Sequence, residues 1–100
     1  MHSVTIYQLP IEHPNAYRDY EFVIRRGKIN LEDYNQVWEG HLATNNLEAI
    51  FRMLNSGHRP DGYKGTSLSV SNIVRLDGSY YYVNDIGFVL LLTDNLGGNI

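Results

Sequence analysis

Three serines alternate along one short segment and are the first candidates for a nucleophile: Ser67, Ser69 and Ser71. A serine hydrolase holds its nucleophile on a sharp strand-to-helix turn, as in Gly-x-Ser-x-Gly, beside a general base. No such motif surrounds these serines. Because hydroxyl groups bond readily to nearby backbone, we expect them to satisfy the chain as it enters a hairpin. A hydrolase that uses Ser67 or Ser71 is the weaker hypothesis.

The histidines could in principle hold a metal or act as acid–base partners of Glu12. Metal sites usually contain local pairs of ligands, such as histidines four residues apart. The four histidines share no such spacing, and the chain has no cysteine: His2, His13, His41 and His58. Acid–base work by Glu12 with His13 and His41 would need a convergence that their spacing does not indicate. The sequence therefore predicts no metal, no cofactor and no enzyme.

A glycine-rich segment at residues 62–67 contains a lysine and two hydroxyl side chains. A phosphate cradle needs a strand, a loop and a helix N-terminus in that order, and this segment follows a loop. We therefore expect a surface loop whose glycines permit positive φ. Together with the cations beside it, this loop is a candidate contact patch for a partner, formed by Arg59, Tyr63 and Lys64.

Tyrosine is abundant, with eight residues, and three of them are consecutive at positions 80–82. In a strand, Tyr81 faces away from its two neighbours, so one face exposes at least one ring. Tyrosine is favoured in interfaces, and Tyr81 is therefore a candidate contact residue. Base stacking would need a positively charged groove, which this segment lacks. We assign the other large aromatic side chains to the core: Trp38, Phe22, Phe51 and Phe88.

The composition indicates one globular domain without strong affinity for duplex DNA. The chain has 100 residues, 43% of them hydrophobic and 19% charged, and its net charge is −3. Residues 1–50 carry that −3 and residues 51–100 sum to zero, so no basic stripe for a duplex is visible. The acidic side chains Glu32, Asp33 and Asp85 are further candidate contacts. No apolar run could span a membrane and no signal peptide is visible, so we expect a cytoplasmic protein.

Hydrophobic periodicity and turn residues predict the elements of the first half. Residues 4–9 alternate and are β-branched, which predicts a strand ended by Pro10. Residues 15–26 fit a helix capped by Asn15 or a strand, and we expect the helix. Residues 30–33 resemble a capped turn, and a strand at 34–39 follows, stopped by Gly40.

The second half begins with a predicted helix and then turns to sheet. Asn45 can cap this helix, with Glu48 three residues later, and its apolar stripe consists of Leu47, Ile50, Phe51 and Leu54. Strands at 72–76 and 80–83 flank Asp77-Gly78-Ser79, a hairpin signature, and a third strand follows at 88–92.

These elements predict an α+β domain over residues 1–93, with a flexible C-terminal tail at 94–100. The domain is mainly an antiparallel sheet with a C-terminal β-hairpin region and one or two helices packed on one face.

Two segments of the second half resemble the closing signature of the YodL-like domain family. They are Gly65-Thr66-Ser67-Leu68-Ser69-Val70-Ser71-Asn72-Ile73-Val74 and Tyr81-Tyr82-Val83-Asn84-Asp85-Ile86-Gly87-Phe88. The resemblance extends upstream to Tyr7-Gln8-Leu9 and to Tyr34-x-x-Val37-Trp38-Glu39-Gly40. Two positions depart from it: Asn72 and Asn84 stand where the family pattern carries Asp, and the acidic residue near Gly87 is displaced to Asp85.

The resemblance implies a setting rather than a catalytic site. Through this resemblance we expect the chain to belong to Firmicute mobile elements, that is, conjugative transposons, plasmids or phages. YodL-like domains occur there beside antirestriction regions. We therefore expect a non-enzymatic protein that binds and inhibits a host nuclease of the CRISPR or restriction type. The alternative is an accessory domain for conjugation or plasmid replication that recruits a partner or single-stranded DNA.

Overall fold

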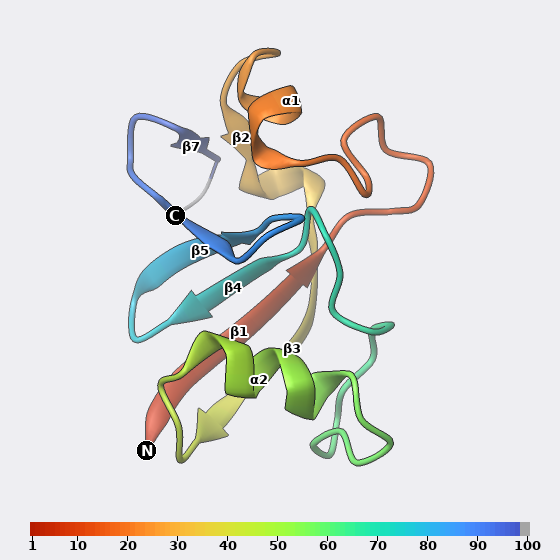
Figure 1. The fold of residues 1–100 in the computed structure, drawn as a ribbon, viewed down its shortest axis with the longest axis vertical. Coiled ribbons are helices and arrows are strands. Elements are labelled where there is room, and N and C mark those ends of the chain that lie inside the picture. Colours follow the sequence, from red (N-terminus) through yellow and green to blue (C-terminus); the bar gives the residue numbers. More distant parts are fainter. Residues whose placement is uncertain (99–100) are drawn as a thin grey trace.

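The computed structural model describes residues 1–98, and its centre is a five-stranded antiparallel sheet (Figure 1). In spatial order the strands are β3 (Asn35–Leu42), β1 (His2–Gln8), β4 (Ile73–Leu76), β5 (Ser79–Val83) and β6 (Phe88–Leu91). β1 pairs with β3 on one side and with β4 on the other, so β3 and β6 form the two edges. The predicted α+β class is confirmed.

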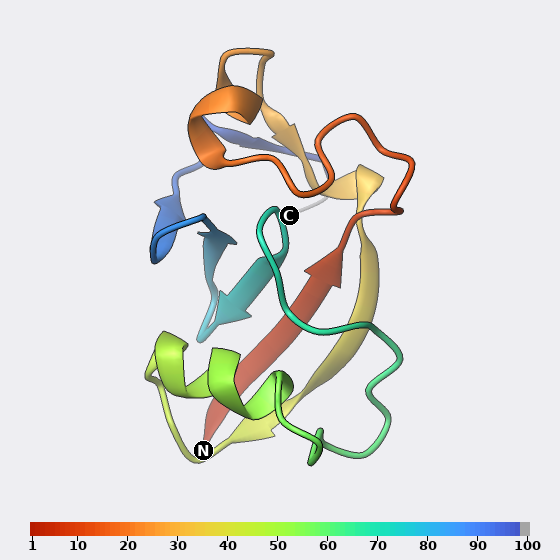
Figure 2. The same ribbon diagram turned by 45° about the vertical axis from the view of Figure 1, so that its right-hand side comes forward.

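The sheet has a hydrophobic core on each side, because side chains alternate between its faces. Helix α2 (Leu47–Leu54) covers one face, where it buries Ile50 and Leu54. The other face is covered by α1 (Tyr20–Ile24), β2 (Ile29–Asn30), the 3-10 turn η1 (Leu31–Asp33) and β7 (Leu96–Gly97). Figure 2 shows α2 along one side of the sheet, with α1, β2 and β7 at the end away from the N-terminus.

The predicted β4–β5 hairpin is confirmed, and its turn has the expected chemistry. Asp77 and Gly78 both have positive φ, 48° and 89°, as a two-residue type I′ turn requires. The Asp77 carboxylate accepts a hydrogen bond from the backbone N–H of Ser3 (3.0 Å) and lies 2.6 Å from Nδ1 of His2. The hydrogen bond with His2 and then the one from Ser3 lower the pKa of Asp77.

Helix α2 is present where its apolar stripe predicts it, but its cap is one residue later than expected. Asn46, not Asn45, caps the helix, and its Oδ1 accepts from the N–H of Ala49 at 3.0 Å. The hydroxyl of Thr44 accepts from the N–H of Asn46, also at 3.0 Å, and thereby holds Asn46 in the capping position.

The helix expected over residues 15–26 is much shorter, because it spans only Tyr20–Ile24. Asn15 was the wrong cap: Asp19 caps the helix and accepts from the N–H of Phe22 at 2.9 Å. Tyr17 has φ of 64°, which no residue inside an α-helix adopts, so the chain before Asp19 forms successive turns.

The strand predicted to stop at Gly40 continues to Leu42. Gly40 pairs with Val4 of β1 in the regular register, so it does not break the strand. A Cβ at this position would collide with the indole ring of Trp38. The glycine therefore provides room for a buried tryptophan, a role that the sequence alone does not distinguish from a strand end.

Part of the segment predicted as a flexible tail contributes to the core. Of residues 94–100 the structure describes 94–98, and Leu96–Gly97 form β7, which pairs in parallel with Ile29–Asn30 of β2. The Leu96 side chain is only 3% exposed. Residues 99 and 100, the rest of the predicted tail, lie outside the described residues.

The uneven charge of the two halves does not produce two separate surfaces. β3 and β1 of the first half lie side by side, and β1 pairs with β4 of the second half. β2 of the first half also pairs with β7 of the second, so the two halves share both sheets. The distribution of charge must therefore be read from the folded surface. None of the helices within residues 1–98 is long and apolar enough to cross a bilayer.

Candidate binding surfaces

Gln8, at the end of β1, anchors the segment that leads into β4. Its buried side chain accepts at Oε1 from the N–H of Thr66 (3.1 Å), and its Nε2 donates to the Thr66 carbonyl (3.1 Å) and to Asn72 Oδ1 (3.2 Å). Asn72 Oδ1 also accepts from the N–H of Ser69 at 2.8 Å. A Cβ at Gly65 would collide with the Gln8 amide. The polar residues of this segment therefore hold its own backbone in place.

Two tyrosines, the half-buried Tyr34 and the buried Tyr82, hold the covering segments with their hydroxyl groups. Tyr34 donates to the carbonyl of Ser71, and Tyr82 donates to the carbonyl of Arg18, both at 2.7 Å. Burial raises the pKa of both phenols far above the ordinary value. Both hydroxyls therefore keep the proton that these hydrogen bonds require.

Two serines of segment 65–74 have structural partners, but only Ser71 bonds to the backbone as predicted. Ser71 is buried with φ of 84°, and its Oγ accepts from the N–H of Tyr17 at 3.0 Å. The hydroxyl of Ser67 accepts from the guanidinium of Arg59 at 2.9 Å. Neither hydroxyl is directed at a histidine by these contacts.

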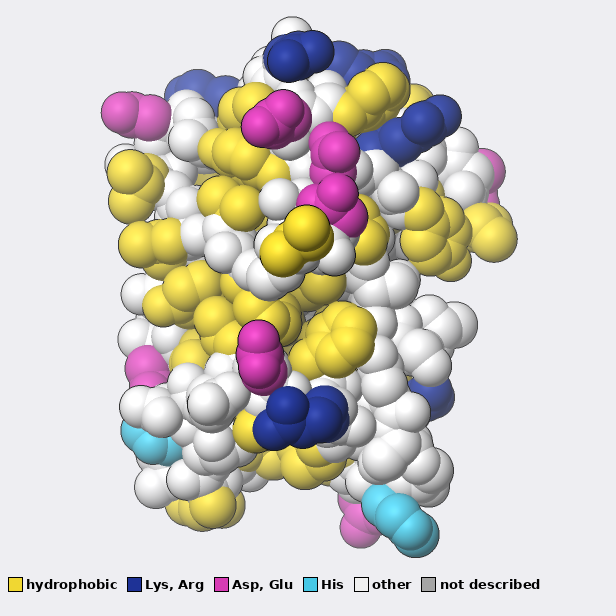
Figure 3. Space-filling view, viewed as in Figure 1, with side chains coloured by type: hydrophobic (Ala, Val, Ile, Leu, Met, Phe, Trp, Pro, Cys, Tyr) yellow, Lys and Arg dark blue, Asp and Glu magenta, His cyan; other side chains and the backbone are white. Residues whose placement is uncertain are grey.

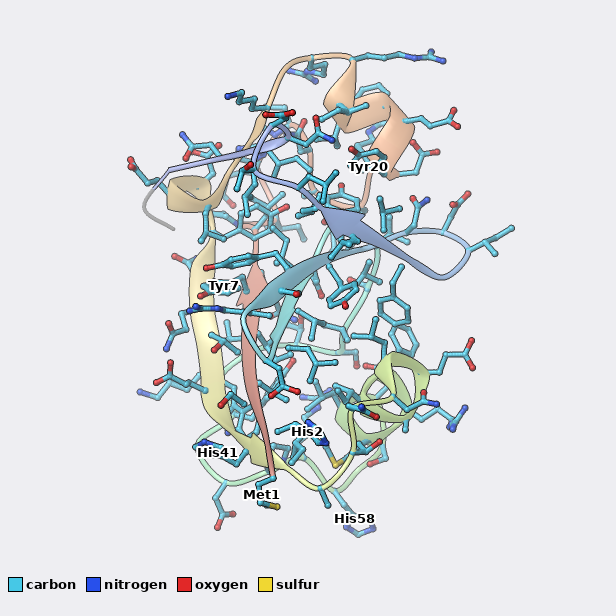
Figure 4. All side chains as sticks on the ribbon, turned by 90° about the vertical axis from the view of Figure 1, so that its left-hand side faces the viewer. Met1, His2, Tyr7, Tyr20, His41 and His58 are labelled. Carbon is cyan, nitrogen blue, oxygen red and sulfur yellow. The ribbon has the colours of Figure 1, made fainter. Side chains whose placement is uncertain are left out.

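The histidines do not gather around a common point. Figure 4 shows His2, His41 and His58 at the end of the molecule opposite Tyr20. His2 pairs with the carboxylate of Asp77, whereas His13 Nε2 lies 3.0 Å from Oδ2 of Asp33. Across the described part of the chain, no three His, Asp or Glu side chains lie close enough to hold a metal.

The predicted patch of Arg59, Tyr63 and Lys64 lies in the loop after α2, and two of its members are engaged internally. Arg59 stacks 5.4 Å from the centre of the Tyr63 ring, and its Nε donates to the Leu54 carbonyl at 2.8 Å, which caps α2. The Tyr63 hydroxyl donates to the carbonyl of Thr66 at 2.8 Å. Burial raises the pKa of Tyr63. Arg59 and Lys64 are exposed and Tyr63 is half-buried, but Lys64 makes none of these internal contacts.

The other predicted contacts lie in two further places. Tyr81 is half-buried in the core on the α2 side, and Asp85 is exposed in the β5–β6 turn. Glu32 and Asp33 are exposed on η1, which covers the opposite face of the sheet. The seven candidates therefore do not form one surface. Asp85 alone borders both of the surfaces described next.

The first surface, here called the β6 surface, consists of exposed and half-buried apolar side chains around the edge strand: Phe51, Ile86, Phe88, Leu90 and Leu92. Ile86 is 88% exposed, Leu90 49% and Leu92 59%. Figure 3 shows apolar side chains that cover the middle of this face, between α2 and the end with α1. None of these five residues was predicted as a contact. The available signal was that residues 88–92 are wholly apolar, so that an edge strand formed by them exposes apolar side chains.

The backbone of β6 is free on its outer side. The N–H of Asn84 donates to the carbonyl of Gly87, and hydrogen-bonded residues alternate along an antiparallel pair. Val89 and Leu91, two and four residues after Gly87, therefore direct their N–H and carbonyl groups toward β5. Phe88 and Leu90 therefore direct theirs outward, and no strand within residues 1–98 pairs there. An apolar edge of this kind can pair with another strand.

A hollow of about 270 Å³ lies between the β5–β6 turn and α2. The rings of Phe51 and Phe88 meet edge to face in its wall, with centroids 6.3 Å apart. Glu48, Arg52 and Asp85 stand around it. The β6 surface therefore combines an apolar centre with a charged rim, as protein interfaces do.

The second surface, here called the α1 surface, surrounds Phe22, which was wrongly assigned to the core. The short helix turns Val23 inward instead, and Phe22 is 39% exposed. The guanidinium groups of Arg18 and Arg26 lie 4.8 and 5.6 Å from its ring centre. The spacing of four residues on either side of Phe22 was the signal that could have indicated this arrangement.

Comparison with known proteins identifies one relationship. A family model described as the YodL-like domain matches residues 3–91. No curated protein and no solved structure matches the chain. The two departures from the family pattern, Asn72 and Asn84, both use Oδ1 to accept backbone N–H groups. An aspartate could accept the same bonds, so both departures preserve the structural contact.

Proposed function

The chain belongs to the YodL-like domain family, and we propose that it acts by binding a host protein, as a non-enzymatic anti-defence inhibitor of a nuclease. The β6 surface is the observation that carries this proposal. Its partner is a nuclease complex of the CRISPR or restriction type, which the protein meets in the cytoplasm. The resemblance to proteins of mobile elements supports this choice, since such elements must survive those nucleases.

The apolar centre of the β6 surface supplies the affinity. Leu90 and Leu92 are each about half exposed, and both flank the free backbone of β6. Burial of such side chains stabilises a complex by about 25 cal/mol per Å² of apolar surface removed from water. A partner strand added beside Phe88 and Leu90 would also use their outward N–H and carbonyl groups.

The rim of the β6 surface supplies the complementarity to a nuclease. Glu48 and Asp85 border the hollow beside the apolar centre, and both are exposed. Nucleases hold their substrate in positively charged channels, and carboxylates at a rim accelerate association with such a surface. An inhibitor with this surface would occupy the channel entrance, where its apolar centre displaces water and its carboxylates meet the basic side chains.

The proposal is tested by cleavage assays with a panel of CRISPR and restriction nucleases, each mixed with the protein before DNA is added. We expect inhibition of at least one nuclease, and loss of that inhibition in Leu90→Glu. The matched control is Ile11→Glu, which places the same charge at another exposed apolar residue, 75% exposed in the loop after β1. It should inhibit as the unmodified protein does.

Two results would contradict the proposal. The first is the absence of binding and inhibition across the panel. The second is equal inhibition by Leu90→Glu and Ile11→Glu, which would show that the partner binds elsewhere. Circular dichroism of both variants establishes that the fold is retained in each case.

A further inference from the structure

The α1 surface gathers all four basic side chains of the first half of the sequence at one end of the molecule: Arg18, Arg25, Arg26 and Lys28. All four are exposed, and none has a carboxylate within 4.0 Å among the ion pairs of residues 1–98. Figure 3 shows the dark blue side chains concentrated at the end that carries α1. The four cations outnumber the two carboxylates of α1 and its cap, Asp19 and Glu21, so the net charge of −3 conceals a locally basic surface.

Phe22 orients two of these cations. Arg18 and Arg26 stack against its ring, at 4.8 and 5.6 Å from the centroid. A guanidinium held on a ring loses little further freedom when it binds, and its planar set of donors matches the oxygens of a phosphate. These two oriented arginines, with the exposed Arg25 and Lys28 near them in the sequence, supply four cations for a phosphate backbone.

A hollow of about 240 Å³ lies beside two of these residues and is lined by Tyr17, Arg18, Asp19, Phe22, Val70 and Asp85. The side chain of Tyr17 is 58% exposed, and its backbone is held by the hydrogen bond to Ser71. Two aromatic side chains and a guanidinium can stack on a flat base. The carboxylate of Asp85 can accept a hydrogen bond from an exocyclic amino group.

We propose that the α1 surface binds single-stranded nucleic acid, with one base in the hollow beside Tyr17 and Phe22 and the adjoining phosphates on Arg18, Arg25, Arg26 and Lys28. An acidic peptide would use the cations but leave the two rings without a partner. Duplex DNA would hide its bases from these rings. This activity lies beyond the proposed inhibition and does not rest on it, because the two surfaces use different side chains apart from Asp85.

The dependence of binding on salt follows from the number of cations. Each phosphate contact on a single strand contributes about 0.7 to the slope of log affinity against log salt, so four contacts give about 2.8. Between about 50 and 200 mM salt the affinity should fall about 50-fold. Removing one cation should weaken binding about eightfold at about 50 mM and reduce the fall to about 18-fold.

The test measures fluorescence anisotropy of a labelled oligo(dA) of about 12 nucleotides, a length typical of single-strand sites and a base with an exocyclic amino group. Arg25→Gln should reduce both the affinity and the salt slope as calculated. Phe22→Ala should weaken binding about tenfold or more, because a stacking contact is lost, but the salt slope should stay at about 2.8, because all four cations remain. Arg52→Gln, an exposed arginine on α2, is the matched control and should change neither value.

Three results would overturn the inference. They are the absence of an anisotropy change at about 50 mM salt, an equal effect of Arg25→Gln and Arg52→Gln, and full competition by polyglutamate at the same charge concentration. The last would identify an acidic protein segment as the ligand. Leu90→Glu should bind the oligonucleotide normally, so failure of this inference and failure of the proposed inhibition are distinguishable.

Discussion

Replacing Gln8 with alanine should lower the free energy of unfolding by about 3 kcal/mol, because the amide of Gln8 holds residues 65–74, the first segment of the family signature, against β1. The N–H of Thr66 loses its acceptor at 3.1 Å, and Asn72 Oδ1 loses one of its two donors. The carbonyl of Thr66 keeps a donor, the hydroxyl of Tyr63 at 2.8 Å.

The magnitude has two parts. One stranded N–H costs about 1–3 kcal/mol when it is shielded from water. The Cγ methylene of Gln8, which alanine lacks, contributes about 0.8 kcal/mol more, since the side chain is only 8% exposed. For a domain of this size, about 3 kcal/mol corresponds to a fall in Tm of about 12–24 °C.

The assay is urea unfolding followed by circular dichroism, with thermal melts as a second measurement. Gln36→Ala is the matched control, since Gln36 is the other glutamine and lies exposed on the edge strand β3. It should change the free energy of unfolding by less than about 0.5 kcal/mol. If Gln8→Ala were as stable as Gln36→Ala, the amide network would not hold this segment, and our explanation of the signature residues would be wrong.

Three further predictions concern the covering elements. Leu96→Ala should cost about 2–4 kcal/mol in urea unfolding, whereas Leu92→Ala, at an exposed position, should cost less than about 0.5. Because burial raises the pKa of Tyr34 and Tyr82, the folded state retains protons that the unfolded state releases. The contribution of these protons to the free energy of unfolding should therefore be fully present below about pH 10 and be lost as the pH rises above it. In thermal melts at alkaline pH, Tyr82→Phe should lose less stability with rising pH than the unmodified protein. Asn84→Ala should lose about 1 kcal/mol, since the N–H of Tyr20 loses its acceptor, whereas Asn84→Asp should stay within about 0.5 kcal/mol of the unmodified protein by the same melts.

The elements that the sequence predicted well are those whose signals are local. The Asp77-Gly78 turn needs two residues that tolerate positive φ, and both are adjacent in the chain. The stripe that begins at Leu47 identifies α2 from residues within two turns of one another. The cap at Asn30 is equally local, because its Oδ1 accepts from the N–H of Glu32.

The features that the sequence did not predict depend on distant partners. Leu96 is buried because β7 pairs with Ile29–Asn30, more than sixty residues earlier, and nothing near Leu96 indicates that strand. Helix α1 is capped by Asp19 rather than Asn15, and its first residue, Tyr20, donates its N–H to Asn84, more than sixty residues later in the chain.

The candidate contacts show the same division. Arg59 and Tyr63 were chosen because they are polar and lie in a loop, but both are used to close that loop onto α2 and onto Thr66. Phe22 was assigned to the core because it is apolar. It lies at the surface instead, where the guanidinium groups of Arg18 and Arg26 contact its ring. Residue type and spacing identify groups that can bind, whereas only the fold shows which of them are already occupied.

The inhibition assay with Leu90→Glu tests the proposed function most directly. With a nuclease that the unmodified protein inhibits, we predict that Leu90→Glu leaves cleavage close to the uninhibited rate and that Ile11→Glu inhibits fully. One charge in the apolar centre should weaken binding by about 2 kcal/mol or more, about 30-fold. Inhibition by Leu90→Glu at the same concentration as the unmodified protein would contradict a role for the β6 surface.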